Sequence, residues 1–137
     1  MSDIPQKVKE AIEKGDRLVS LFNMKIGPLE EGKSVVSMRI GKQHLNAAGV
    51  CHGGVIFSLS DVAFALASNS YGTIALALEM SVSYTRAVMA GQTLTARCNE
   101  QYRGRRTATY LIEVTNEKGE LVALLKGTVF RKDESLI

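Results

Sequence analysis

The chain has 137 residues, with 17 basic and 14 acidic side chains and a formal net charge of +3. This length predicts one domain over residues 1–137 with a single sizeable core, and the small positive charge favours an anionic small molecule over a nucleic acid as partner. Cys51 and Cys98 form no CxxC motif, and the polar and charged first residues do not read as a secretory leader, so we expect reduced core cysteines in a cytoplasmic protein. The polar residues 68–73 interrupt the uncharged stretch 62–78, which excludes a membrane span there.

The N-terminal segment predicts a helix that packs on the outside of the domain. Ser2 or Asp3 can serve as its N-cap, and Pro5 fits its first turn. Gly15 weakens the helix at its other end. The apolar residues at helical spacing are Ile4, Val8, Ala11 and Ile12.

Two strands are expected next, over Leu21–Ile26 and Val35–Ile40. The second has an apolar side chain at every other position, the period of a half-buried strand. Because the polar segment 30–33 lies between the two strands, they are predicted to form a hairpin.

The segment from Gly53 to Asn69 predicts a central, buried helix, since nearly all of its side chains are small or apolar. Asp61 is the only formally charged residue between His52 and Glu79. Burying an ionised carboxylate without partners lowers the stability of the fold. Such a residue therefore has a raised pKa, accepts hydrogen bonds from nearby donors, or is retained because it takes part in catalysis. Asp61 is therefore the first candidate for a catalytic group.

Four more strands follow, separated by Gly91, by a turn of three arginines around Gly104 and by the turn 116–119. These turn signals predict that each strand pairs antiparallel with the next. An early buried helix in a run of about six strands predicts an α+β domain in which a bent antiparallel sheet wraps the helix. The four strands are expected over Thr73–Ser83, Thr93–Tyr102, Thr107–Thr115 and Leu121–Arg131.

The chain contains two longer motifs: N-x2-G-x2-H-G-G-x6-D from Asn46 to Asp61, and E-M-S-V-S-Y-T-R-A-V-M-A-G from Glu79 to Gly91. They resemble the hotdog-fold acyl-CoA thioesterases of the phenylacetate-degradation (PaaI-like) type, and with the later strands the resemblance covers nearly the whole chain. It implies a hotdog fold and hydrolysis of an acyl-CoA with an aryl, phenylacetyl-type or medium-chain acyl group. It also implies a homodimer with active sites at its interface, often paired into a homotetramer.

Helix geometry independently predicts an active site built from two subunits. Asp61 follows Gly53 by more than two helical turns, about 12 Å along the axis, so one helix cannot bring both to the same carbon. If Asp61 acts on a carbonyl held by the Gly53 amide, a two-fold dimer with antiparallel helices supplies the carboxylate from the second copy.

The resemblance and the helix start together suggest a role for each residue. The Gly53 amide would polarise the thioester carbonyl, and Asp61 would be general base or nucleophile. Asn46 would hold the water or the thioester, and His52 would order the loop and contact the leaving group. The further residues expected to bind substrate are Gly54 and Ser58.

Each of these residues also has a structural interpretation. Asp61 could be satisfied by Ser58 or Asn46, and the glycine pair could be turn chemistry at a helix start. His52 could be a loop histidine bonded to backbone, and Asn46 could form an Asx turn.

Arginine side chains gather in the turn around Gly104. Their guanidinium groups suit the phosphates of coenzyme A, which makes Arg103, Arg105 and Arg106 candidate substrate-binding residues. The alternative, which we favour, is a solvated hairpin tip.

The chain departs from the family pattern on the predicted strand Thr73–Ser83. Where some relatives carry a Ser or Thr that positions water, the best aligned residue is Ala77, and Thr73 or Ser83 could take its place. The segment after Tyr84 also lacks the proline found in many relatives.

Other catalytic patterns are weak or absent in this sequence. It has no G-x-S-x-G elbow, no nucleotide-binding glycine loop and no zinc-ligand spacing, and neighbours such as Cys51 and His52 point to opposite faces of an extended segment. We predict no metal and no redox cofactor. A non-catalytic acyl-CoA-binding hotdog protein, acting as sensor or scavenger, is the alternative function, and a hydratase is a third.

Overall fold

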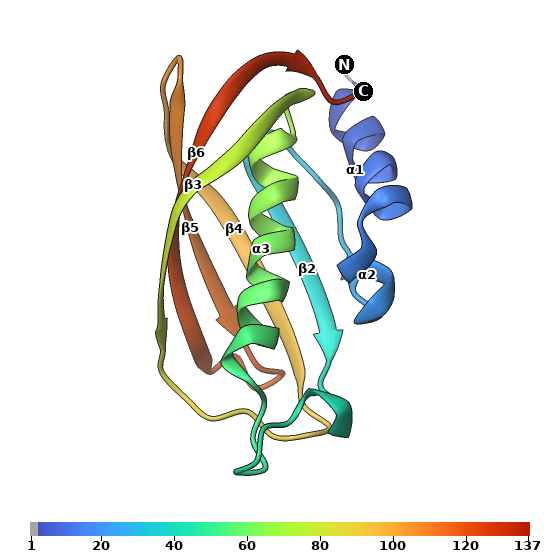
Figure 1. Ribbon diagram of the computed structural model, residues 1–137, viewed down its shortest axis with the longest axis vertical. Helices are drawn as coiled ribbons and strands as arrows, with labels where there is room; N and C mark the ends of the chain where they lie inside the picture. Colours follow the sequence, from blue (N-terminus) through green and yellow to red (C-terminus); the bar gives the residue numbers. More distant parts are fainter. Residues whose placement is uncertain (1–2) are drawn as a thin grey trace.

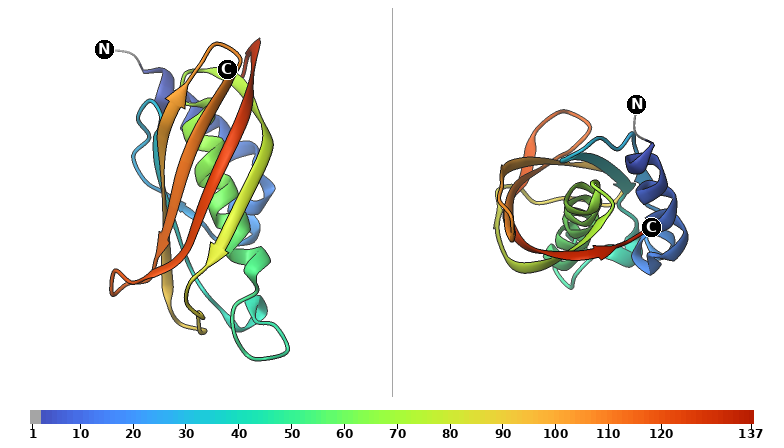
Figure 2. Two further views of the ribbon diagram at one scale, coloured as in Figure 1. Left: turned by 90° about the vertical axis from the view of Figure 1, so that its left-hand side faces the viewer. Right: turned by 90° about the horizontal axis from the view of Figure 1, so that it is seen from above.

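A computed structural model of the chain describes residues 3–137. Its elements in chain order are α1 (Ile4–Gly15), α2 (Arg17–Leu21), β1 (Lys25–Ile26), β2 (Lys33–Arg39), the 3-10 turn η1 (Lys42–His44), α3 (Gly53–Asn69), β3 (Thr73–Tyr84), β4 (Thr93–Arg103), β5 (Thr107–Thr115) and β6 (Leu121–Ser135). The strands form one antiparallel sheet of six, which curls around α3 (Figures 1 and 2). This is the predicted α+β arrangement, the hotdog fold.

The N-terminal helix α1 lies outside the sheet beside α3, as predicted (Figure 1). Pro5 is in its first turn, and Asp3 is at the N-cap position, although its side chain accepts no capping hydrogen bond. Ser2, the other predicted cap, lies outside the described residues. Val8 is the buried residue through which α1 packs inward.

The predicted strand over 21–26 is wrong for most of its length: a second short helix, α2, ends at Leu21, and residues 22–24 form a turn and an irregular residue before β1. The Asp16 side chain starts α2 by accepting hydrogen bonds from the backbone N–H groups of Leu18 (2.9 Å) and Val19 (3.4 Å). Asn23 then has a positive φ of 51°, which turns the chain toward β2. Only Lys25–Ile26 pairs with β2, in the predicted antiparallel sense.

The sheet order is β1-β2-β4-β5-β6-β3. The neighbours β4, β5 and β6 pair antiparallel as predicted. The expected pairing of β3 with β4 is wrong, because β3 pairs with β6 at the far edge of the sheet. One side of β3 therefore has no neighbouring strand in the described chain.

The core lies between α3 and the concave face of the sheet, and α3 has the predicted bounds and burial. The Phe64 ring meets the Tyr110 ring edge to face at 5.7 Å between centroids. Gly127 on β6 makes room for Phe64, since a Cβ there would lie 2.7 Å from Cζ of the ring. No helix within residues 3–137 is both long and apolar enough to cross a membrane.

Candidate active site

The start of α3 presents two backbone amides, those of Gly53 and Gly54, that have no hydrogen-bond acceptor within residues 3–137. His52 is the N-cap, and its carbonyl accepts from the N–H groups of Val55 and Ile56. Free amides at a helix start, together with the helix dipole, attract negative charge. The site can therefore donate two hydrogen bonds to an oxyanion.

A cavity of about 520 Å³ opens at this helix start, between the loop before α3 and the segment after β3. Two hydrogen bonds join its walls. The Cys51 N–H donates to the Val88 carbonyl at 2.8 Å, and the Tyr84 hydroxyl donates to the Gly53 carbonyl at 2.8 Å. The lining residues are Val50, Cys51, Gly53, Ile56, Tyr84, Thr85, Arg86, Ala87 and Val88.

Sequence reasoning assigned no role to Tyr84. In the sequence, the only feature that marks Tyr84 is its place in the second family motif. Gly53, whose carbonyl accepts its hydrogen bond, is 31 residues away in the chain. The contact between them became visible only in the folded protein.

Asp61 lies half-buried on the stripe of α3 that the sheet does not cover. Its carboxylate has no hydrogen bond or ion pair with any of residues 3–137. Burial raises the pKa of Asp61 above its usual range, and the negative charge of Asp16 raises it further. The residues of this stripe that retain exposure are Gly54, Phe57, Ser58, Asp61 and Ala65.

The two side chains named as possible partners of Asp61 are engaged elsewhere. The Ser58 hydroxyl donates to the Gly54 carbonyl at 2.8 Å. The Asn46 side-chain oxygen accepts from the N–H groups of Ala48 (2.9 Å) and Val50 (3.3 Å), which is the predicted Asx turn. The side-chain nitrogen of Asn46 has no acceptor in the described chain, so two N–H donors remain for a ligand.

His52 contributes to the loop through its backbone. Its N–H donates to the His44 carbonyl at 2.9 Å. Its side chain is exposed and makes no hydrogen bond within residues 3–137. The imidazole is thus available to a ligand at the helix start.

The structure separates the predicted residues within one subunit. Gly53 and Gly54 lie at the helix start, and Asp61 does not line the cavity there. The β4–β5 hairpin with its arginines lies at the opposite end of the sheet from the start of α3 (Figure 1).

Two of the three hairpin arginines have partners of their own. The Arg103 guanidinium stacks over the Tyr71 ring at 3.9 Å from its centroid. Arg106 lies 3.9 Å from the Asp133 carboxylate, and both side chains are exposed. Arg105 makes no contact of this kind within residues 3–137.

The strand register places Ala77, which aligns with the water-positioning Ser or Thr of relatives, and Ser83, one of its two predicted substitutes, on different faces of β3. Ala77 is opposite Val129, a core residue, so it faces the side of the sheet that carries α3. Ser83 is opposite Leu124, which points outward. Ser83 therefore points away from α3 of its own subunit.

Both cysteines are free and buried. Burial raises the pKa of the Cys51 thiol to about 11 and raises that of Cys98 further. Both thiols are protonated near neutral pH, as expected of core residues. Within the described residues, no group of three or more His, Cys, Asp or Glu side chains could hold a metal ion.

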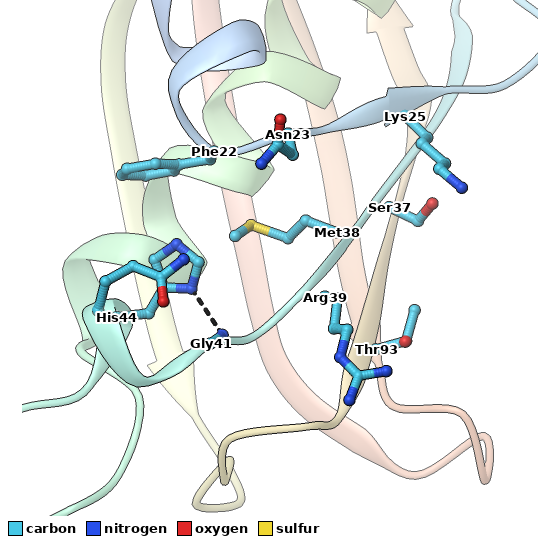
Figure 3. A pocket seen from close by; sticks show the side chains of 10 residues that line it. Phe22, Asn23, Lys25, Ser37, Met38, Arg39, Gly41, His44 and Thr93 are labelled. Carbon is cyan, nitrogen blue, oxygen red and sulfur yellow. Dashed lines mark hydrogen bonds between the residues drawn. The ribbon is translucent and has the colours of Figure 1, made fainter.

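A second cavity of about 520 Å³ lies between the turn after α2, strand β2 and the 3-10 turn η1 (Figure 3). Lys25 and Arg39 border it, and none of the predicted site residues does. His44 Nδ1 accepts from the Gly41 N–H at 2.9 Å, and its ring packs edge to face on Phe22 at 5.3 Å. Because the His44 carbonyl bonds the His52 N–H, this wall supports the loop before α3.

Comparison with known proteins agrees with this geometry. The family model described as thioesterase superfamily matches residues 48–123. A putative esterase of Archaeoglobus fulgidus is 50% identical over 133 residues, 97% of this chain and 86% of the relative. Acyl-coenzyme A thioesterase PaaI of Escherichia coli is 38% identical over 121 residues, 88% of this chain and 86% of the relative.

Solved structures give the same result. The structure of the E. coli PaaI protein superposes with a TM-score of 0.95 at 35% identity, covering 98% of this chain and 97% of that chain. A Streptococcus mutans protein solved with bound acetyl-CoA superposes with a TM-score of 0.79 at 31% identity, covering 82% and 91%. The chain belongs to the thioesterase superfamily and, within it, to the PaaI-like family of hotdog-fold thioesterases.

Proposed function

We propose that this thioester hydrolase cleaves acyl-CoA thioesters, with aryl, phenylacetyl-type or medium-chain acyl groups, to a free acid and coenzyme A in the cytoplasm. The observation that carries the proposal is the pair of free amides at Gly53 and Gly54 beside a cavity. The name of the E. coli relative and the acetyl-CoA bound to the S. mutans relative support the substrate class.

The helix start acts on the thioester carbonyl. Its oxygen accepts a hydrogen bond from the Gly53 amide, and the α3 dipole stabilises the negative charge that grows on this oxygen as the carbonyl is attacked. The charge is largest in the tetrahedral intermediate, so the interaction favours the transition state over the bound substrate.

Asp61 supplies the attacking group. As general base it takes a proton from water, whose oxygen adds to the carbonyl carbon; the C–S bond then breaks and the proton passes to the departing sulfur. As nucleophile its oxygen displaces the thiolate and forms an acyl-aspartyl anhydride, which water hydrolyses to the acid. Both routes require the ionised carboxylate.

The carboxylate that meets each Gly53 comes from the partner subunit's Asp61. Within one subunit Asp61 lies about 12 Å further along α3 and outside the cavity. The free edge of β3 supports a two-fold dimer, since Leu76 and Leu78 on it are 52% and 61% exposed. Two such dimers then pair into a homotetramer.

The remaining residues bind the substrate around this centre. The free side-chain N–H groups of Asn46 donate to the thioester or to the attacking water, and the exposed His52 imidazole contacts the leaving group. Gly54 and Ser58 line the approach along the uncovered stripe of α3.

The test is a panel of acyl-CoA substrates, with release of free coenzyme A measured by a thiol reagent. The wild type is compared with Asp61→Asn and Asp61→Ala, and Asp3→Asn serves as a control for loss of an exposed carboxylate. We expect kcat to fall at least about 100-fold in both Asp61 variants, with folding and assembly intact.

Unchanged turnover in either Asp61 variant would contradict the assigned role. A wild type that binds acyl-CoA tightly and releases no thiol would instead favour the non-catalytic sensor or scavenger.

A further inference from the structure

Tyr84, the last residue of β3, contacts the first residue of α3 in two ways. Its hydroxyl donates a hydrogen bond to the Gly53 carbonyl oxygen at 2.8 Å. Its ring lies against the Gly53 backbone, because a Cβ built there would be 2.9 Å from Cζ and 3.0 Å from Oη of Tyr84. Tyr84 therefore fixes the start of α3 from the opposite wall of the cavity, and a side chain at position 53 would have to displace its ring.

This hydrogen bond acts on the peptide group that contains the Gly54 N–H. The amide bond joins the Gly53 carbonyl to the Gly54 nitrogen, and in a helix the carbonyl points toward the C-terminus while the N–H points out of the N-terminus. A donor on the carbonyl polarises the group and strengthens its N–H as a donor. The Gly54 N–H has no acceptor within residues 3–137.

We propose that Tyr84 is a positioning residue of the oxyanion hole. It orients and polarises the peptide between Gly53 and Gly54, so that the Gly54 N–H becomes a second donor to the thioester oxygen beside the Gly53 N–H. This inference rests on the proposed function and deepens it, since it assigns the second donor and the residue that holds it in place.

The ionisation state of Tyr84 fits this role. Partial burial raises the pKa of its hydroxyl above the ordinary value of 10.0, so the group keeps its proton near neutral pH. The hydroxyl donor is therefore present from the pH at which Asp61 ionises up to the raised pKa of Tyr84.

Tyr84→Phe is the decisive variant, because it keeps the ring against Gly53 and removes only the hydroxyl. We expect kcat to fall about three- to tenfold, the factor that one neutral hydrogen bond provides, with KM changed less than about twofold. The control is Tyr102→Phe, which removes an exposed hydroxyl without a hydrogen bond in the described chain and should change neither constant. An unchanged kcat in Tyr84→Phe, or a change in KM alone, would overturn the inference.

The amide proton of Gly54 gives a readout that a purely structural role would not move. We expect its NMR resonance to shift upfield in Tyr84→Phe, whereas that of Gly119, in a distant turn, stays in place. An unchanged Gly54 resonance in an active enzyme would refute the role of Tyr84 and leave the proposed function standing. Absence of hydrolysis by the wild type, with the Gly54 shift present, would refute the proposed function and with it the catalytic meaning of the contact.

Discussion

The Asp16 carboxylate, which caps α2, raises the pKa of the Asp61 carboxylate on α3. Burial is the larger cause and acts in the same direction. Asp61 is thus harder to ionise than an ordinary aspartate, and the proposed reaction requires its ionised form. This relationship ties the N-terminal helices, which lie outside the sheet, to the chemistry of the site.

The acidic limb of the pH profile should report this coupling. We expect kcat/KM to fall as the pH drops through the pKa of Asp61, with a midpoint above the ordinary value of 3.8. In Asp16→Asn the limb should move to lower pH and stay above 3.8, because burial still raises the pKa, and Asn retains the cap of α2. Profiles over about pH 4 to 8 check this, with Asp3→Asn as control. Superimposable profiles for Asp16→Asn and wild type would show that the two carboxylates do not interact.

The same pKa shift predicts that Asp61 costs stability near neutral pH. Because its pKa is raised on folding, the folded state binds more protons between the ordinary and the raised value, so the free energy of unfolding falls as pH rises through that window. Asp61→Asn should therefore raise Tm at pH 7 by a few degrees, and the gain should vanish below pH 3.8. Calorimetry at fixed protein concentration measures it. A lower Tm at pH 7 would mean that Asp61 has partners in the assembled protein.

Mixing two inactive variants tests whether the active site is shared between subunits. Asp61→Asn removes the carboxylate, and Gly53→Pro removes the N–H that would donate to the thioester oxygen, at the first position of α3, where a helix accepts proline. A heterodimer of the two contains one site with Gly53 and Asp61 both intact. After unfolding and refolding together in equal amounts, we expect about a quarter of the wild-type activity. If both residues acted in the same subunit, the mixture would stay as inactive as its parts.

The central helix could be predicted with its bounds from the sequence. The small and apolar run from Gly53 to Asn69 is a local pattern, and a local pattern is sufficient to define a buried helix. The short helix α2 was missed because its signal is one capping residue, Asp16, followed by only five residues. Five residues are too few to show the helical spacing of apolar side chains.

The pairing of β3 could not be predicted from turn signals, because contacts distant in the chain decide it. The segment after Tyr84 does not reverse into a hairpin. It is held to other parts of the chain, since the Val88 carbonyl accepts from Cys51 and the Gly91 N–H donates to Ile40. The same argument covers the site: the motif located Gly53 and Asp61, but the hydrogen bond from Tyr84 depends on the fold that these distant contacts produce.

Arg105 offers a test of whether the β4–β5 hairpin binds the phosphates of coenzyme A. It is the hairpin arginine without an ion pair or ring contact within residues 3–137, and its hairpin lies at the end of the sheet opposite the start of α3. In the proposed dimer with antiparallel helices, it would therefore act on a substrate held by the partner subunit. If it pairs with a phosphate, Arg105→Glu replaces attraction by repulsion, and KM for an acyl-CoA should rise about three- to tenfold. KM for the same acyl group on N-acetylcysteamine, which carries no phosphate, should stay the same. Lys118→Glu makes the same change of net charge in an exposed turn and controls for long-range effects. Equal KM values for Arg105→Glu and wild type on the acyl-CoA would identify the hairpin as a solvated tip.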